Sequence, residues 1–167
     1  MMKYLIDANT FITPYRGYAP MDVAVTLWDK FKDMSNSGTI VLLDRVQQEL
    51  FINSDALHLW VDANFNVAAI ETFQNNQQAV AKYATISRWA ASQNRSQKAL
   101  EKFLRPDAAD IFLVSYAATD PTNYTVVSFE VSNHNGSSEF KLPDVCNQFG
   151  VKCIPFQDMF RELNETY

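Results

Sequence analysis

Long apolar runs are missing from this sequence of 167 residues. No window approaches the roughly 18 to 20 consecutive apolar residues that a membrane-spanning helix needs. The apolar stretch that begins at Met1 meets an acid at Asp7, before the hydrophobic core of a signal peptide has formed. We therefore expect a protein without a membrane anchor, located in the cytoplasm.

Cysteine is also scarce. Only Cys146 and Cys153 are present, and they lack the paired Cys and His spacing of a zinc site, so we interpret them as reduced, half-buried thiols. Repeats, low-complexity tracts and linker-like segments are missing as well. With 47% hydrophobic residues, a chain of this length can bury one substantial core. The sequence thus predicts a single domain over residues 1–167.

Positive charge is in deficit, since 14 Lys and Arg face 19 Asp and Glu and the net charge is -5. Proteins that coat nucleic acid usually neutralise phosphate with an excess of Lys and Arg, so the composition argues against that class. The argument weakens if the acids are gathered in one pocket. Divalent cations bound in such a pocket would reverse the local charge and attract phosphate.

What the sequence does contain is an alternation of short apolar segments with segments of helical periodicity. Strands are expected at 3–6, 39–43, 123–129 and 151–154. Helices are expected at 21–34, 44–51, 53–64, 70–91, 95–104, 107–118, 143–150 and 157–163, with loops at 8–20 and 132–138. Such alternation implies a parallel sheet covered on both faces. We predict a three-layer α/β/α fold around a central parallel sheet of four or five short strands.

Four acidic residues have placements that favour one edge of this sheet. Asp7 and Glu130 follow strand ends, Asp110 lies in the first turn of a helix, and Glu49 lies one turn into the helix after the second strand. Ligands of open α/β sheets bind at the carboxyl ends of the strands, so these side chains are expected to converge. Converging carboxylates repel one another unless a divalent cation lies between them. Their hard oxygen ligands favour Mg²⁺ or Mn²⁺.

Each acid also has a simpler interpretation. Asp7 suits a turn at a strand end, Glu49 suits an exposed helix face, and Glu130 suits a solvent-facing position before a loop. Asp107 and Asp110 have the spacing of a helix N-cap and its partner in the first turn, and capping is the preferred role for Asp107. The hypothesis of a metal site therefore depends on the four acids taken together.

The segments around these acids resemble the four motifs of PIN domains. They are LIDANTF at 5–11, VQQEL at 46–50, ADIFLVSYA at 109–117 and VVSFE at 126–130. Their order and spacing agree with that family along nearly the whole chain. The resemblance implies a PIN-like fold and a metal-dependent ribonuclease that hydrolyses RNA phosphodiester bonds.

The resemblance also implies roles for individual residues. The catalytic residues and ligands of one or two Mg²⁺ or Mn²⁺ ions would be Asp7, Glu49, Asp110 and Glu130. Asn9 would hold Asp7 or a metal-bound water, and Ser128 would donate a hydrogen bond to Glu130. Candidate contacts to the RNA backbone are Arg16, Lys82, Arg88, Arg95 and Lys98, although each also suits a solvated surface. The three tryptophans, Trp28, Trp60 and Trp89, are expected in the core rather than against RNA bases.

Two features depart from the usual PIN pattern. The fourth acid is Glu130 rather than Asp, and no further acid follows it closely. Asp144 is a candidate for returning to the site in its place, and the alternative is an acid in the first turn of a helix. The segment KLPDVC at 141–146 resembles a toxin-like branch of the family. That resemblance implies the toxin of a toxin-antitoxin pair, with a separate antitoxin protein and a possible homodimer as partners.

Two other functions stay open at this point. A PIN-like fold can bind RNA or a partner protein without cleaving, which the acidic charge and Glu130 allow. Asp7-Ala8-Asn9-Thr10 also faintly resembles the nucleophile loop of haloacid-dehalogenase-type phosphatases. That chemistry needs a general acid two residues after the first Asp, and the amide of Asn9 cannot supply a proton in that way.

Overall fold

The computed structural model describes residues 1–65, 69–133 and 139–167. Within these ranges one all-parallel sheet has the strand order β3-β2-β1-β4-β5. Its strands are β1 (Lys3–Ile6), β2 (Ile40–Leu43), β3 (Ile70–Glu71), β4 (Tyr124–Val127) and β5 (Lys152–Ile154). At the centre, Leu5 of β1 lies opposite Val41 of β2 and Val126 of β4. The prediction of an α/β fold with a central parallel sheet is confirmed.

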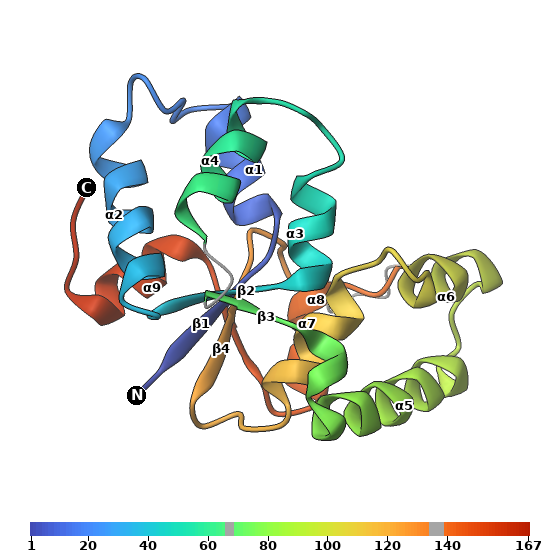
Figure 1. The fold of residues 1–167 in the computed structure, drawn as a ribbon. Helices are drawn as coiled ribbons and strands as arrows, with labels where there is room; N and C mark the ends of the chain where they lie inside the picture. The colour runs from blue at the N-terminus through green and yellow to red at the C-terminus, as the bar shows by residue number, and fades with distance from the viewer. Residues whose placement is uncertain (66–68, 134–138) are drawn as a thin grey trace.

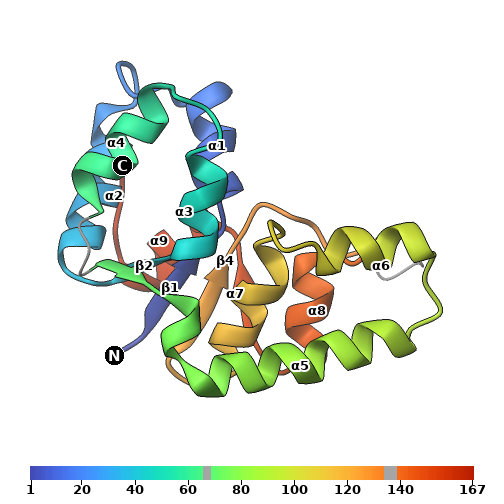
Figure 2. The same cartoon turned by 45° about the vertical axis from the view of Figure 1, so that its right-hand side comes forward.

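Helices cover both faces of the sheet (Figure 1 and Figure 2). One side carries α1 (Asn9–Arg16), α2 (Val25–Asn36), α4 (Ala56–Asn64) and α9 (Phe156–Leu163). The other side carries α5 (Gln77–Ser92), α7 (Asp110–Ala117) and α8 (Leu142–Gln148), with α6 (Gln97–Leu104) following α5. The helix α3 (Asp44–Leu50) starts directly at the carboxyl end of β2, and the short 3₁₀ helix η2 (Phe73–Asn75) precedes α5.

The three central strands are buried on both faces because they are nearly continuous apolar runs. In β2 all four residues are buried, and in β1 and β4 only the first residue is partly exposed. This pattern is typical of parallel strands that lie between two helical layers. The edge strands β3 and β5 are shorter and more exposed. The carboxyl ends of β1 and β4 are therefore held rigidly side by side.

Aromatic side chains fill the layer between the sheet and helices α1, α2, α4 and α9. They pack mostly edge to face, and Phe11 and Phe31, for example, have ring centroids 5.1 Å apart. We name this group the aromatic core, and it consists of Phe11, Trp28, Phe31, Trp60, Phe65, Phe156 and Phe160. On the other side of the sheet, Trp89 packs against Phe140 and Phe149. The expected core role of the three tryptophans is confirmed.

Several element boundaries differ from the predictions. The segment 8–20, predicted as a loop, contains α1, in which Pro14 lies in the second turn. Proline is tolerated because it removes a single backbone donor and the helix ends two residues later. The predicted helix at 70–91 begins instead with β3 and η2, and α5 starts at Gln77, where the Asn76 carboxamide accepts from the Ala79 N–H at 3.0 Å.

Other predictions concern the loops, the thiols and the membrane. The predicted loop 132–138 lies outside the described residues from position 134 onward. Cys146 and Cys153 are free thiols, as expected. Cys153 is half-buried as predicted, whereas Cys146 is fully buried. No helix among the described residues is both long and apolar enough to cross a membrane.

Candidate metal centre

Asp7 is fixed at the carboxyl end of β1 by its backbone. Its N–H donates to the Val127 carbonyl of β4 at 2.9 Å, and its own carbonyl accepts from the Thr10 N–H at 3.0 Å. The Thr10 hydroxyl donates to the same Val127 carbonyl at 3.0 Å. The Asp7 residue is only 3% exposed. A carboxylate this buried, at the junction of the two central strands, has no freedom to turn into solvent.

The Ser128 hydroxyl connects Asp7 to the chain beyond β4. It donates to Asp7 Oδ2 at 2.8 Å and accepts from the backbone N–H of Glu130 at 3.1 Å. Because a hydroxyl has one proton to donate, that proton cannot also serve the Glu130 carboxylate. The prediction that Ser128 donates to Glu130 is therefore wrong. The Ser128 hydroxyl donates to Asp7, and its contact with Glu130 is with the backbone N–H of that residue.

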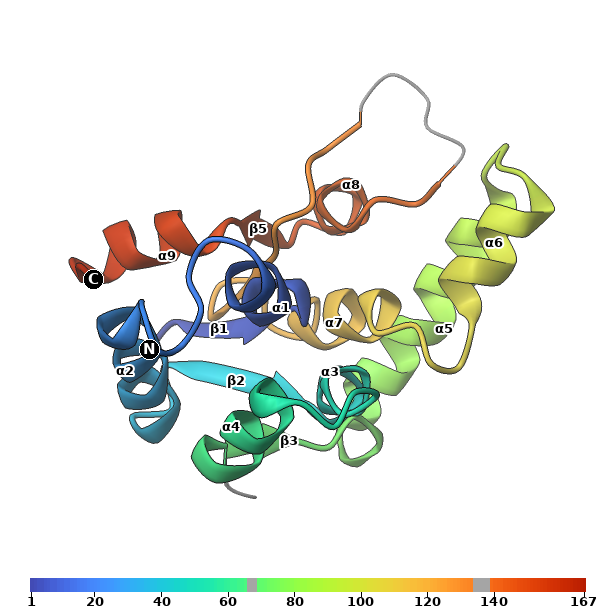
Figure 3. The same ribbon diagram turned by 90° about the horizontal axis from the view of Figure 1, so that it is seen from above.

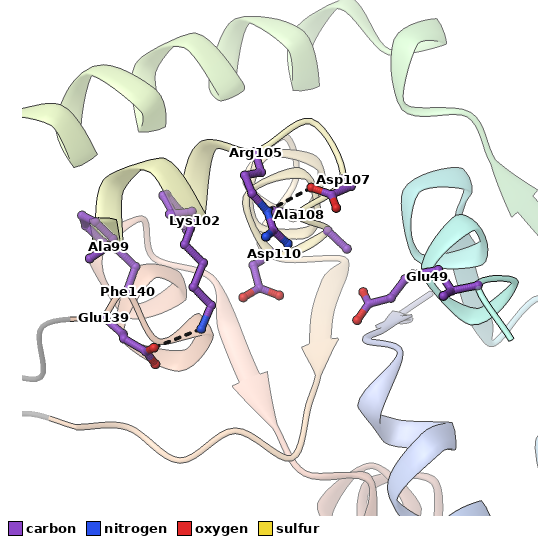
Figure 4. Close-up of a pocket in the computed structure, with 12 residues that line it drawn as sticks. Glu49, Ala99, Lys102, Arg105, Asp107, Ala108, Asp110, Glu139 and Phe140 are labelled. Atoms are coloured by element: carbon purple, nitrogen blue, oxygen red, sulfur yellow. Dashed lines mark hydrogen bonds and ion pairs between the residues drawn. The ribbon is translucent and has the colours of Figure 1, made fainter. Parts of the chain in front are cut away.

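Asp110 and Glu49 face the same space from two different helices. Asp110 is the first residue of α7, Glu49 lies in the second turn of α3, and both are half-buried. Figure 4 shows their carboxylates pointing toward one another across the cleft. The cleft has a volume of about 210 Å³ and is bounded on its other sides by α6 and by the chain at 139–140.

Glu130 is held by the start of α8. Its Oε2 accepts from the Leu142 N–H at 2.9 Å, and the residue is half-buried. The Glu130 side chain thus spans from the segment after β4 to the first residue of α8. This contact fixes the position of Glu130 and joins the fourth acid to the layer that contains Asp110.

The four carboxylates act on one another electrostatically. Burial raises the pKa of Asp7 to about 7, with Glu49 and Glu130 adding to the rise and the Ser128 hydrogen bond opposing it. Burial likewise raises the pKa of Asp110 to about 7, and the charges of Asp7 and Glu130 add to it. These shifts mark a cluster of acids whose charge is only partly balanced by the protein itself, since Lys102 and Lys141 oppose the rise at Asp110.

Glu49 belongs to the same cluster but lies nearer its mouth. Burial raises its pKa, and the charges of Asp110, Asp107 and Glu130 raise it further. All four acids selected from the sequence are therefore brought together at the carboxyl edge of the sheet. The simpler interpretations of Asp7 as an isolated turn residue and of Glu49 as a solvated surface acid do not fit this arrangement.

The remaining predicted residues are placed elsewhere. The Asp144 carboxylate accepts from the Ser132 hydroxyl and from the Asn133 N–H at 3.1 Å, so it ties down the segment that follows Glu130. Its role as a metal ligand stays a prediction. Asn9 is half-buried at the start of α1, and its side chain makes no hydrogen bond within the described ranges.

The capping role predicted for Asp107 is wrong. Helix α7 begins at Asp110, directly after Ala109, with no side-chain cap. Asp107 instead forms an exposed ion pair with Arg105 at 3.1 Å. The chain turns between Pro106 and Ala109 before the helix starts, which moves Asp107 out of the capping position and onto the rim of the cleft.

The donor set suits a hydrated divalent cation better than a closed cage. In the part of the chain that the structure describes, no three His, Cys, Asp or Glu side chains are arranged closely enough to hold an ion as they stand. Mg²⁺ commonly keeps several water ligands and takes only one or two carboxylates directly. Carboxylates with raised pKa values, all oxygen donors, fit such a cation because its charge would relieve their mutual repulsion.

Three basic residues near this site were not predicted from the sequence. Lys102 and Arg105 line the cleft, on the side opposite Glu49 (Figure 4). They follow Lys98 at helical spacings of four and seven residues, and this periodicity is the signal that could have identified them as one face. Lys141 is a third such residue, since its charge, like that of Lys102, lowers the pKa of Asp110.

Comparison with known proteins gives one family. Residues 4–167 match the family described as Domain of unknown function (DUF4411). This chain belongs to that family. The DUF4411 match includes all four acids, so the whole carboxylate cluster lies within the domain. No curated protein and no solved structure matches the chain.

Proposed function

We propose that this chain is a metal-dependent endoribonuclease that hydrolyses RNA phosphodiester bonds at the carboxylate cluster. The observation that supports this most strongly is the convergence of acids from four separate segments of the chain at one edge of a parallel sheet. Two of them, Asp7 and Asp110, have pKa values that burial raises to about 7. Proteins keep such destabilising clusters where chemistry requires them.

The resemblance to PIN domains gives the cluster its proposed reaction class. The four acids of the motif-like segments interact with one another electrostatically in the fold, and the α/β/α architecture with an all-parallel sheet agrees with that resemblance. Membership of the PIN family is itself part of the proposal. Under it, Asp7, Glu49 and Asp110 would hold Mg²⁺ or Mn²⁺ directly or through water, and Glu130 would complete the set.

The protein's own groups have distinct tasks in this proposal. A bound divalent cation supplies Lewis-acid activation of water and neutralises charge on the phosphate. Ser128 keeps Asp7 oriented by donating to its Oδ2. The backbone N–H of Leu142 keeps Glu130 oriented in the same way. Burial of Asp7 beneath the sheet edge excludes bulk water from one side of the cluster, which strengthens its interaction with any cation there.

The test combines hydrolysis with cation binding. The purified chain is expected to cleave a quenched fluorescent RNA oligonucleotide only with Mg²⁺ or Mn²⁺. Asp7→Asn and Asp110→Asn should each reduce cleavage about a thousandfold, which corresponds to roughly 4 kcal/mol of activation free energy. Calorimetric titration should show the same two substitutions weakening Mn²⁺ binding.

The matched control is Asp62→Asn, the same chemical change at an exposed position on α4. It should leave cleavage and Mn²⁺ binding unchanged. If both cluster variants cleave RNA as fast as the control, the nuclease proposal is wrong. Release of phosphate from p-nitrophenyl phosphate, lost in Asp7→Asn, would support the phosphatase alternative instead.

The biological setting stays a prediction. The role of toxin, the separate antitoxin protein and the homodimer follow only from the resemblance of segment 141–146 to a toxin-like branch. Cleavage of RNA by the isolated chain, and its arrest by the product of a neighbouring gene, would support that setting.

A further inference from the structure

The basic residues of this acidic protein are concentrated in one part of the fold. Residues 77–105, which form α5 and α6, contain six of the fourteen Lys and Arg residues and one of the nineteen acids, Glu101. We name this part the basic arm. Its net charge is +5, whereas the chain as a whole carries -5. Figure 3 shows the arm extending away from the sheet, with α6 beyond the end of α7.

Within the arm, α6 presents its positive charge on a single face. Ala99 and Phe103 are buried against the rest of the protein. Lys98, Lys102 and Arg105, spaced four and three residues apart, share an exposed face that includes the cleft wall. This arrangement makes a positively charged ridge that leads along α6 to the carboxylate cluster.

At the cleft, two ammonium groups from different elements converge on one carboxylate. Lys102 Nζ of α6 lies 3.0 Å from Glu139 Oε1, and Lys141 Nζ lies 3.2 Å from Glu139 Oε2. Figure 4 shows Lys102 reaching Glu139 beside Asp110. Two cations that share one anion form an anion site, and here the protein's own carboxylate fills it. Ion pairs this exposed contribute little free energy, so an incoming anion can replace Glu139 at small cost.

This anion site lies next to the acids of the cluster. Lys102, Glu139 and Asp110 line the same cleft. The charges of both lysines lower the pKa of Asp110, which places both ammonium groups within electrostatic range of it. An anion bound between the lysines would therefore lie beside the site of the proposed hydrolysis.

We propose that Lys102 and Lys141 form a phosphate-binding subsite for single-stranded RNA. In the absence of RNA, the Glu139 carboxylate occupies this subsite. Lys98 and Arg105 continue it along α6. The substrate class named here rests on the proposed nuclease function. A phosphodiester presents two oxygens of one negative charge, as the Glu139 carboxylate does, so it can bridge the same two ammonium groups. A cleft of about 210 Å³ beside the exposed basic face of α6 suits one extended strand, since single-strand binding relies on a positive groove that follows the backbone.

The test measures binding separately from cleavage. A short fluorescein-labelled oligouridylate is titrated with the chain in EDTA, so that no strand is hydrolysed and no divalent cation contributes. Lys102→Ala combined with Lys141→Ala should raise Kd on the order of tenfold. The slope of log Kd against log salt concentration should fall by about 0.7 for each phosphate that the protein no longer neutralises. Glu139→Gln should lower Kd, because a neutral amide with a single acceptor oxygen competes less well with phosphate for the two lysines.

Matched controls come from an ion pair outside the cleft. Lys30 Nζ of α2 lies 2.5 Å from Glu165 Oε2, in the chain after α9. Lys30→Ala and Glu165→Gln each change the net charge by one unit, as each cleft substitution does. They should change Kd only slightly. Equal effects of the cleft and control variants per unit of charge would overturn the subsite, because the net charge alone would then govern binding. Binding of polyglutamate or of duplex RNA as tightly as oligouridylate would overturn the assignment to single-stranded RNA. A failure of the unmodified chain to bind oligouridylate at low salt would overturn it as well.

Failure of the subsite and failure of the nuclease give different results. If cleavage depends on Asp7 and Asp110 while the lysine variants bind and cleave normally, the subsite is wrong and the nuclease stands. If RNA binds through Lys102 and Lys141 but is not hydrolysed with Mg²⁺ or Mn²⁺, the subsite stands and the nuclease proposal fails.

Discussion

The aromatic core packs against one face of the sheet and the carboxylate cluster lies at the carboxyl ends of its strands, and the two regions differ in what they contribute to the protein. Phe11, which follows β1 by a few residues, packs against four other rings of the aromatic core. Asp7, at the end of that strand, is equally inaccessible but is surrounded by other acids. One region stabilises the fold by burial of apolar area, and the other lowers its stability by burial of charge.

The difference shows where to look for function in such a chain. A buried aromatic cluster is explained by stability alone, whereas buried acids that repel one another need a second reason. If this division is correct, substitutions in the aromatic core should lower stability and spare activity. Substitutions of the clustered acids should lower activity and spare or raise stability.

The largest expected effect is on stability, in the aromatic core. Phe31 is fully buried and contacts Phe11, Trp28, Phe156 and Phe160. Phe31→Ala should lower the free energy of unfolding by about 3 to 5 kcal/mol, measured by urea denaturation, because it removes a large ring and leaves a cavity. The folded fraction should cleave RNA at the unaltered rate.

The control for this change is Leu59→Ala on α4, where the side chain is 70% exposed and little stability is expected to be lost. A strong reduction in the cleavage rate of folded Phe31→Ala protein would show that the aromatic core and the acids are coupled, which would break the comparison.

Asp7→Asn is expected to raise the free energy of unfolding, by less than Phe31→Ala lowers it. The pKa of Asp7 in the folded chain is about 7, above its ordinary value of 3.8, so between these values the folded state binds the proton more tightly than the unfolded state. The bound proton therefore adds to the free energy of unfolding. This contribution is fully present at low pH, below 3.8, and is lost as pH rises through about 7. Asn cannot lose such a proton, so at pH 8 the variant should be more stable than the unaltered chain by roughly 1 to 3 kcal/mol.

The measurement is urea denaturation of both proteins between pH 4 and pH 8, without divalent cations. The difference in unfolding free energy should grow with pH in favour of Asp7→Asn. A difference that stays constant over this range, or that favours the unaltered chain at high pH, would contradict the raised pKa.

The smallest effect concerns Ser128, which supports Asp7 from the end of β4. Ser128→Ala removes the hydrogen bond to Asp7 Oδ2, so the pKa of Asp7 should rise further and its orientation should loosen. Cleavage near pH 7 should fall about tenfold, with partial recovery at higher pH. The control is Ser115→Ala, a buried serine whose hydroxyl donates to the Ile111 carbonyl within α7. Equal losses in the two variants would indicate a general packing effect.

Much of the fold could be predicted because its central strands are strongly patterned. The runs that become β1, β2 and β4 are apolar on both faces, which is the mark of a buried parallel strand. The edge strand β3 could not be found in this way, since two residues show no periodicity and the helical pattern of α5 follows closely. Helix α1 was hidden by Pro14, which predicts a break that tertiary packing overrides.

The acids were easier to predict than their surroundings. Asp7, Glu49, Asp110 and Glu130 follow from strand ends and helix starts, which are local features of the sequence. The partner of Ser128 depends on which way its hydroxyl turns once β1 and β4 are paired, and no local pattern encodes this. The shared contact of Lys102 and Lys141 with Glu139 likewise joins segments that only the fold brings together.

The pairing of β1 with β4 also has a consequence for the timing of synthesis. Residues 3–6 leave the ribosome about 120 residues before their β4 neighbours at 124–127, and such distant pairing forms late. During that interval Asp7 lies at the end of a strand that can pair with β2 but lacks its β4 neighbour. A nascent chain has no assembled cluster of acids, so the proposed nuclease would be silent on the ribosome that makes it.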